Sequence, residues 1–229
     1  AVDSGMGRIG VVNEKELTEV EAVLRNGPFE FEGMFTHFAT ADEEDTAHLT
    51  KQEEKFNGMI GELEERPLHI HCSNSAYAIW HSAGDSDIIR YGIGLYGINP
   101  SNGDLCVEDE EHLTPALQWE TEMVKVKKLE IGDTVSYGAT YTAREPQWVA
   151  TLPVGYADGY IRAYNKGEVI VDGVRCPIIG RVCMDQCMIR LLHEYPVGTK
   201  VTLLGKNKEE EITAIELAKR ADTIAYEVI

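Results

Sequence analysis

The chain has 229 residues, of which 43% are hydrophobic, and a formal net charge of −18. This length allows a large core in one or two domains. The negative charge argues against nucleic acid and anionic membranes as partners, and no apolar run reaches the ~18 residues that a membrane span needs. The five cysteines are odd in number and irregularly spaced, which predicts reduced thiols and a cytoplasmic location.

The first ~110 residues predict alternating strands and helices. Ala1-Val2-Asp3 has the pattern of a strand tail, and a glycine-rich turn with Arg8 follows it. Asn13 can cap the next helix, and Asn26-Gly27-Pro28 ends it. The apolar stripe of this helix is formed by Leu17, Val20, Val23 and Leu24. The next predicted elements are a strand over 29–38, a helix from about Asp45 to Arg66-Pro67, a strand over 68–72, a helix over 76–81 and a buried strand at Ile88-Ile89.

This alternation is typical of a parallel sheet with right-handed crossovers. About four βα units are present, whereas a closed barrel needs eight, so residues 1–110 predict the C-terminal portion of a (β/α)8 barrel. Polar residues fall at or just beyond the carboxyl ends of the predicted strands, which is the edge where such sheets bind ligands. They are Arg8, His37, His71, Asn74, Ser75 and Arg90.

Short strands separated by turns are predicted from residue 111 to residue 229. We expect an antiparallel domain of about seven strands, with Asp172-Gly173 as a hairpin turn. A late helix over 215–221 has a capping box from Thr213 to Glu216, and 225–229 predicts a final strand. The acidic stretch Glu108–His112 is the most linker-like part of the chain.

One stretch, IIRYGIGLYGINP over 88–100, places Arg90 among apolar neighbours and glycines. An arginine in such a run needs an anion or an acceptor as partner, and glycines past a strand end allow a close approach to a phosphate. The alternative is a glycine-rich strand in a core, with Arg90 in a structural ion pair. These residues alone leave both interpretations open.

Other candidate residues are less specific. His37 and His71 lie at the same depth on neighbouring predicted strands, but a third metal ligand at a convincing spacing is missing, and the CxxxC pair at Cys183 and Cys187 has no partner pair. We therefore predict no metal site. Tyr137 stands between small residues and could act as an acid or base beside a cation, or could simply be packed.

Seven motifs occur in order over nearly the whole chain: DSGMGRIG, THFATADE, HCSNSA, RYGIGLYG, VSYGATYT, PVGYADGY and GRVCMDQCMI. Together they resemble the bacterial alanine racemases, and several long motifs in one order are far more specific than a lone glycine pattern. The resemblance implies a pyridoxal 5′-phosphate (PLP) enzyme with an N-terminal barrel, a C-terminal β domain and a head-to-tail homodimer. It implies an isomerase that interconverts L- and D-alanine for cell-wall peptidoglycan.

The resemblance also implies roles for single residues. Arg90 would donate a hydrogen bond to the pyridine nitrogen of PLP, His71 would brace Arg90, and His37 would lie against the cofactor ring. The residues implied at the cofactor phosphate are Ser75, Gly92, Ile93 and Tyr226.

Arg8 would face the cofactor's phenolic oxygen and the substrate carboxylate, and Met184 would offer its backbone N–H to that carboxylate. Tyr137, from the partner subunit, would be one of two acid/bases at Cα. The residues that resemble the family's substrate corridor are Tyr156, Arg162, Arg181 and Asp185.

The second acid/base of the family is a lysine that also carries PLP as a Schiff base, in a motif similar to VKANAYGHG, and this motif is absent here. Ala1 stands where many members have a modified lysine. We therefore expect a fragment that lacks early barrel units and the extreme C-terminus, is inactive alone, and associates with a second copy or with the missing barrel half. Alternatives are a racemase of another small amino acid such as serine, a non-catalytic PLP-binding protein, or an interaction fragment.

Overall fold

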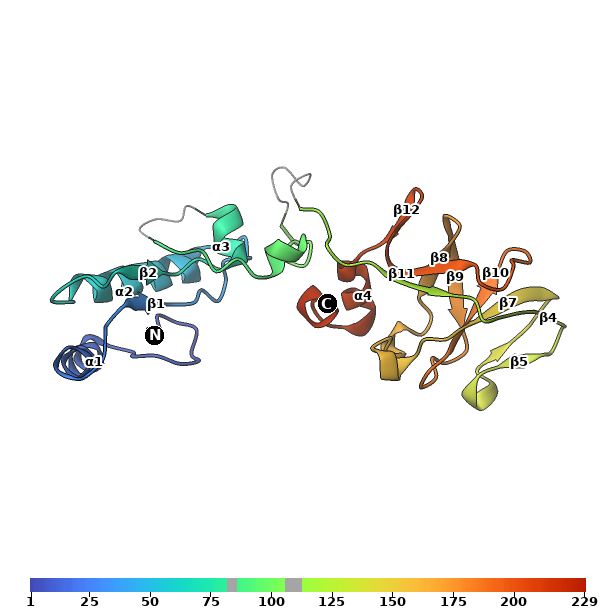
Figure 1. The fold of residues 1–229 in the computed structure, drawn as a ribbon, viewed down its shortest axis with the longest axis horizontal. Helices are drawn as coiled ribbons and strands as arrows, with labels where there is room; N and C mark the ends of the chain where they lie inside the picture. Colours follow the sequence, from blue (N-terminus) through green and yellow to red (C-terminus); the bar gives the residue numbers. More distant parts are fainter. Residues whose placement is uncertain (82–85, 106–112) are drawn as a thin grey trace. The chain divides into compact units, whose positions relative to one another are not determined.

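The computed structural model describes residues 1–81, 86–105 and 113–229. It divides into two compact units, Ala1–Thr114 and Pro115–Ile229, drawn in blue to green and in green to red in Figure 1. The boundary proposed between residues 110 and 111, the linker-like stretch Glu108–His112 and Cys106 all lie outside the described residues.

Helix α1 of the first unit runs from Glu14 to Asn26 and begins at the predicted cap. The Asn13 side chain accepts a hydrogen bond from the backbone N–H of Glu16 at 3.0 Å, which satisfies one of the free donors of the first turn. Leu17 is buried, but Val20 and Val23 are 43% and 63% exposed. The predicted apolar stripe is therefore covered only in part within this unit.

Helix α2 spans Ala47–Gly61, and its apolar face forms the centre of the first core. Leu49, Phe56 and Met59 are each at most 3% exposed. Burying side chains of this size contributes about 1.5–3 kcal/mol each. The predicted helix and its inward face are confirmed, but the helix ends at Gly61, earlier than the predicted end at Arg66-Pro67.

Strands β1 (Gly33–Phe35) and β2 (His69–His71) pair in parallel, with Phe35 opposite His71. Val2 extends this arrangement, because its backbone N–H donates to the Phe35 carbonyl at 2.8 Å and it bridges to Val11. Helix α3 (Ser75–Trp80) follows β2 at once. The chain therefore has the predicted combination of a partial barrel and an antiparallel β domain, and the described residues include no closed barrel.

The buried strand predicted at Ile88-Ile89 is wrong. Both side chains are exposed, at 39% and 50%, and the segment belongs to no strand. Side-chain oxygens take two backbone donors here, because the Asp87 carboxylate accepts from the Ile70 N–H at 2.7 Å and the Ser86 hydroxyl accepts from the Cys72 N–H at 3.3 Å. Among the described residues, a single backbone bond joins the segment to β2, from the Asp87 N–H to the Ile70 carbonyl at 2.7 Å.

Ten strands are described in the second unit, against the roughly seven predicted. Eight form one antiparallel sheet in the order β12-β11-β8-β9-β10-β7-β4, with β3 pairing to β11, and β5 and β6 form a separate hairpin. Their bounds are β3 Trp119–Glu122, β4 Lys125–Leu129, β5 Thr134–Val135, β6 Tyr141–Thr142, β7 Gln147–Leu152, β8 Glu168–Val171, β9 Val174–Ile179, β10 Cys187–Leu191, β11 Lys200–Asn207 and β12 Glu210–Ile212. The hairpin covers one face of the sheet, where Val135 packs with Leu129, Val149 and Ile179.

Helix α4 runs from Ala214 to Ala221, and the Thr213 hydroxyl accepts from the Glu216 N–H at 3.1 Å, as the capping pattern predicts. The final strand predicted over 225–229 is wrong, because Ala225–Glu227 forms a 3₁₀ turn, η6. Asp172 and Gly173 form the predicted hairpin turn, with φ of 52° and 80°. None of the described helices is long and apolar enough to span a bilayer.

Candidate active site

Arg90 is the centre of the polar cluster in the first unit. One guanidinium nitrogen, Nη1, lies 2.7 Å from His71 Nδ1, and the other, Nη2, donates to the Thr36 carbonyl at 2.8 Å and to the Cys72 carbonyl at 3.2 Å. His37 Nδ1 lies 3.4 Å from the same Nη2 atom. The sequence predictions for Arg90, His71 and His37 therefore fall at one place, at the ends of β1 and β2.

The two histidines beside Arg90 are held in the neutral form. Burial lowers the pKa of His71, and the Arg90 charge lowers it further. Burial likewise lowers the pKa of His37, followed by the charges of Arg90 and Arg8. Because arginine has donors only, His71 Nδ1 must be the acceptor, which places its proton on Nε2. The His71 ring also stacks on Phe35, with centroids 5.1 Å apart.

Arg90 retains donor capacity for a ligand. Within the described part of the chain, its Nε–H makes no hydrogen bond, whereas both Nη atoms do. Its partners there are neutral: a histidine nitrogen and backbone carbonyls. A fixed, half-buried guanidinium with a free Nε–H suits a neutral acceptor such as a ring nitrogen. This donor set fits the predicted contact with PLP.

The glycine-rich segment after Arg90 meets the start of α3. The Ser75 hydroxyl accepts from the Gly92 N–H at 2.9 Å and the Gly94 N–H at 3.3 Å. Ile93 opens the 3₁₀ helix η1 (Ile93–Tyr96), and its N–H has no acceptor among the described residues. A serine hydroxyl beside a free backbone N–H group can hold a phosphate. Three of the residues predicted at the phosphate are thus together.

Arg8 lies on an exposed loop whose conformation is stabilised by hydrogen bonds to Asp3. The Asp3 carboxylate accepts from the Gly5 N–H at 3.0 Å and the Gly7 N–H at 2.9 Å, which lowers the pKa of Asp3. Both glycines have positive φ, 150° and 70°, so the loop needs them. Arg8 is close enough for its charge to lower the pKa of His37.

Gln52 is a site residue that the sequence predictions missed. It is fully buried on α2, and its side chain donates to the His37 carbonyl at 3.1 Å and accepts from the Ala39 N–H at 2.8 Å. It therefore fixes the backbone that carries His37. The signal was available, because a glutamine between Leu49 and Phe56 on the apolar face of a helix needs buried partners.

Three segments of the second unit meet at the predicted substrate residues. The first holds Tyr137 in the 3₁₀ turn η3 (Tyr137–Ala139), where the tyrosine side chain is 71% exposed. The Ser136 hydroxyl fastens this turn by donating to the Arg181 carbonyl at 2.7 Å. The second segment contains Tyr156, in η4 (Tyr156–Asp158), and the third runs from Gly180 to Asp185.

The second and third segments are held by backbone contacts. The Tyr156 N–H donates to the Cys183 carbonyl at 3.0 Å, and the Ala157 N–H donates to the Met184 carbonyl at 2.8 Å. A Cβ on Gly155 would lie 2.3 Å from that Cys183 oxygen, so only glycine fits there. The Met184 N–H has no acceptor in the described part of the chain, and it is free to bind a carboxylate.

The remaining predicted residues are exposed. Arg162 opens the turn η5 (Arg162–Tyr164), Arg181 and Asp185 flank Met184, and Tyr226 lies in η6. The structure thus assembles one group of predicted residues in each unit. The contacts implied between the groups, such as His37 with Tyr137, remain predictions.

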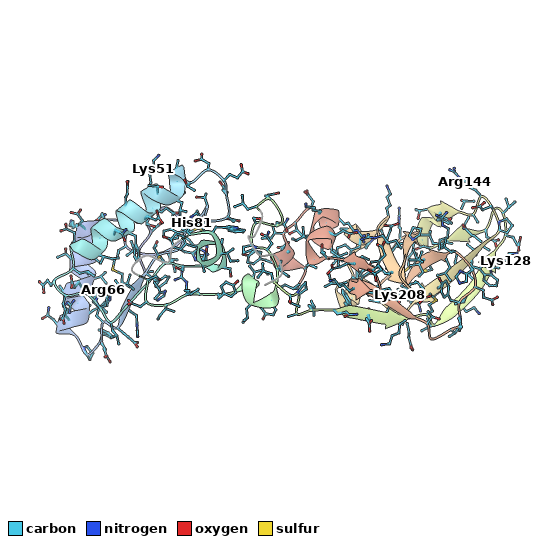
Figure 2. All side chains as sticks on the ribbon, turned by 90° about the horizontal axis from the view of Figure 1, so that it is seen from above. Lys51, Arg66, His81, Lys128, Arg144 and Lys208 are labelled. Carbon is cyan, nitrogen blue, oxygen red and sulfur yellow. The ribbon has the colours of Figure 1, made fainter. Side chains whose placement is uncertain are left out.

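Among the described residues of the first unit, no lysine contacts the Arg90 cluster. Lys51 lies on the exposed side of α2 and Lys128 lies on β4, as Figure 2 shows. Lys55 donates to the Asp3 carbonyl at 2.9 Å instead. Nor do the described residues contain three His, Cys, Asp or Glu side chains grouped to hold a metal ion.

Comparison with known families matches almost the whole chain. Residues 1–100 match the family model described as alanine racemase, N-terminal domain, and residues 116–229 match alanine racemase, C-terminal domain. A curated relative from Latilactobacillus sakei, named alanine racemase, is 49% identical over 231 residues, which cover 100% of this chain and 60% of the relative. The chain therefore spans about three fifths of the length of the curated relatives it matches.

Solved structures give the same result. The crystal structure of alanine racemase from E. faecalis is 45% identical with a TM-score of 0.95, and the match covers 100% of this chain and 61% of that one. A histidine racemase from Leuconostoc mesenteroides is 33% identical with a TM-score of 0.90, covering 98% of this chain and 61% of that one.

Proposed function

Because the chain belongs to the alanine racemase family, we propose that it provides most of the machinery that interconverts L- and D-alanine. The Arg90 cluster is the observation that carries this proposal. Neutral acceptors hold the Arg90 guanidinium in place and leave its Nε–H free. It provides a fixed donor for an uncharged ring nitrogen.

The family uses PLP, and the described residues fit this cofactor. Arg90 would hold the ring nitrogen, while Ser75 and the N–H of Ile93 would hold the phosphate, helped by Gly92 and Tyr226. When bound, PLP withdraws electrons and so acidifies the Cα–H of an amino acid. Arg90 cannot lend a proton to the ring, because a guanidinium stays charged, so the ring remains neutral. A neutral ring limits electron withdrawal and favours simple racemisation over side reactions.

The residues proposed to contact the substrate are Arg8, Met184 and Tyr137. The free N–H of Met184 and the Arg8 guanidinium are suited to its carboxylate. Tyr137 would move a proton to or from one face of Cα. A lysine would act on the other face, and the sequence contains no motif similar to VKANAYGHG in which that lysine stands. The corridor to this site would contain Tyr156, Arg162, Arg181 and Asp185.

We further propose a homodimer in which Tyr137 acts in the partner's site. Two open edges of a partial sheet favour association with a second copy or with the rest of the barrel. A monodisperse monomer at high concentration, measured by light scattering, would contradict this proposal. The described cysteines Cys72, Cys176, Cys183 and Cys187 are all free thiols, which fits a cytoplasmic location.

Two experiments test the function. In a racemase completed by adding to both ends of the chain the flanking residues of the L. sakei relative, Tyr137→Phe should lower kcat at least ~100-fold, the range that a positioned acid/base contributes. Full activity in that variant would exclude the acid/base role. The 229-residue chain alone should show no absorbance band of a protein-bound PLP imine. A band that borohydride abolishes would show that another lysine serves.

A second candidate is a racemase of another amino acid. The neighbour named histidine racemase supports it, because the same fold there is associated with another substrate. Serine, the other small amino acid considered, differs from alanine by a single hydroxyl. Ratios of kcat/KM for alanine, serine and histidine in the completed enzyme separate these possibilities, and a ratio that favours alanine over both supports the first proposal.

A further inference from the structure

We propose that Ser136 is a positioning residue that fixes Tyr137 through the backbone. The inference rests on the acid/base role proposed for Tyr137. Tyr137 is 71% exposed, so packing within its own chain does not hold the side chain in place. Its position must therefore come from the backbone on which it is mounted, and Ser136 determines that backbone.

Ser136 has a backbone conformation that residues other than glycine rarely adopt. Its φ is 68° and its ψ is 178°. Residues remain in this region only where the surrounding structure enforces it, and such positions concentrate at functional sites. A glycine would adopt this conformation without strain, yet the chain has a serine here, so the hydroxyl must contribute something that glycine lacks.

The hydroxyl provides an attachment to a neighbouring segment. Ser136 Oγ donates to the Arg181 carbonyl at 2.7 Å and lies 3.6 Å from Cys183 Sγ. This contact joins the Tyr137 turn to the segment that carries Met184. This hydrogen bond therefore fixes the Tyr137 turn to the segment that carries the proposed carboxylate donor.

Gly180 provides the room for this attachment. A Cβ at Gly180 would lie 2.6 Å from Ser136 Cβ and 3.0 Å from the Val135 carbonyl oxygen, and its φ is 72°. The two segments can approach this closely only with glycine at 180. On the other side, the Ala139 N–H donates to the Ser136 carbonyl at 3.1 Å and closes the turn around Tyr137.

Hydrogen–deuterium exchange on the 229-residue chain tests the attachment. In Ser136→Ala, amides over 136–140 should exchange about fivefold to tenfold faster, as the loss of one neutral hydrogen bond predicts. Ser136→Gly, which removes the backbone strain and the hydroxyl together, should show the same gain and guards against a misfolded alanine variant. The matched control is Thr199→Ala, which removes a hydroxyl-to-carbonyl bond of equal length to Pro196. Unchanged exchange in both Ser136 variants would overturn the proposal.

Isotope effects in the completed racemase test the positioning. A displaced Tyr137 slows proton transfer on one face of Cα, so Ser136→Ala should lower kcat about tenfold or more. The primary effect of Cα-deuterium should rise for one alanine enantiomer only. A general loss of folded enzyme would lower kcat and leave both isotope effects unchanged. If Tyr137→Phe is inactive but Ser136→Ala shows no such asymmetry, the positioning role of Ser136 is wrong and the acid/base role of Tyr137 stands. If Tyr137→Phe is fully active, the acid/base role of Tyr137 is itself wrong.

Discussion

Gly155→Ala tests whether the segments around Met184 are held by a backbone contact that only glycine permits. Gly155 has φ of −153° and ψ of −161°, which any residue can adopt, so alanine adds no backbone strain there. Its Cβ would lie 2.3 Å from the Cys183 oxygen and 2.5 Å from the Met184 oxygen. Neither atom belongs to a flexible side chain, so the two segments must separate.

The size of the effect follows from what that separation breaks. The hydrogen bonds from Tyr156 and Ala157 to those two carbonyls contribute about 1 kcal/mol each. Overpacking against fixed atoms adds about 1–3 kcal/mol. We expect the free energy of unfolding of the second unit to fall by about 3–5 kcal/mol, which is exceptional for one methyl group.

Urea unfolding followed by tryptophan fluorescence measures this free energy. A Trp80→Phe background leaves Trp119 and Trp148 as reporters of residues 115–229, because the chain has three tryptophans. The control is Gly198→Ala, where φ is 88° and nothing lies within 4 Å, so only backbone strain of about 1–2 kcal/mol applies. The reasoning is refuted if Gly155→Ala costs no more than this control.

Three further outcomes are expected. Burial and the Arg90 charge lower the pKa of His71, so as the pH falls the unfolded chain binds a proton at this residue before the folded chain does. The contribution of His71 to stability should therefore be full above about pH 6.5 and decline below it. His71→Asn should reduce that decline in urea titrations from about pH 7.5 to 5. Burial raises the pKa of Cys187 to about 12, so at pH 8 a thiol reagent should modify half-buried Cys183 and spare Cys187 unless urea is added. Arg175→Met should lower the unfolding free energy by about 2–3 kcal/mol in the same fluorescence assay, because Arg175 Nε bonds Glu210 at 2.8 Å and Nη1 bonds Glu216 at 2.8 Å; an unchanged midpoint would contradict this.

Local signals in the sequence predicted most of the helices. Asn13 and Thr213 were identified as caps, and both accept the expected backbone N–H. Alternation and turn residues predicted the antiparallel domain, although its shortest strands were missed, because two or three residues such as those of β12 give no periodic pattern.

The errors came from side chains that replace backbone partners. Ile88-Ile89 has the composition of a strand, but Asp87 and Ser86 occupy the donors of β2 with side-chain oxygens. The final segment has apolar residues of strand type, yet Thr223 bonds Glu227 and the chain turns. Such contacts depend on tertiary geometry, which composition does not contain.

The sequence predicted which residues form the site, but not the contacts that hold those residues in place. Strand ends brought Arg90, His37 and His71 to one edge, as parallel strands require. The position of Gln52 on an apolar helix face indicated that it needs buried partners but not which ones, and the strained backbone of Ser136 follows from packing alone.

The neutral surroundings of Arg90 have a consequence for how an anionic ligand arrives. The net charge of −18 repels an anion at a distance. Among the described residues, Arg90 is hydrogen-bonded only to histidine nitrogens and to carbonyls, so no carboxylate there compensates its positive charge. Attraction therefore dominates only close to the site, and repulsion dominates further out. Salt screens the distant charges more than the half-buried one, over a length of about 8 Å at physiological ionic strength. Moderate salt should accordingly speed the capture of an anion at this site, the reverse of ordinary electrostatic steering.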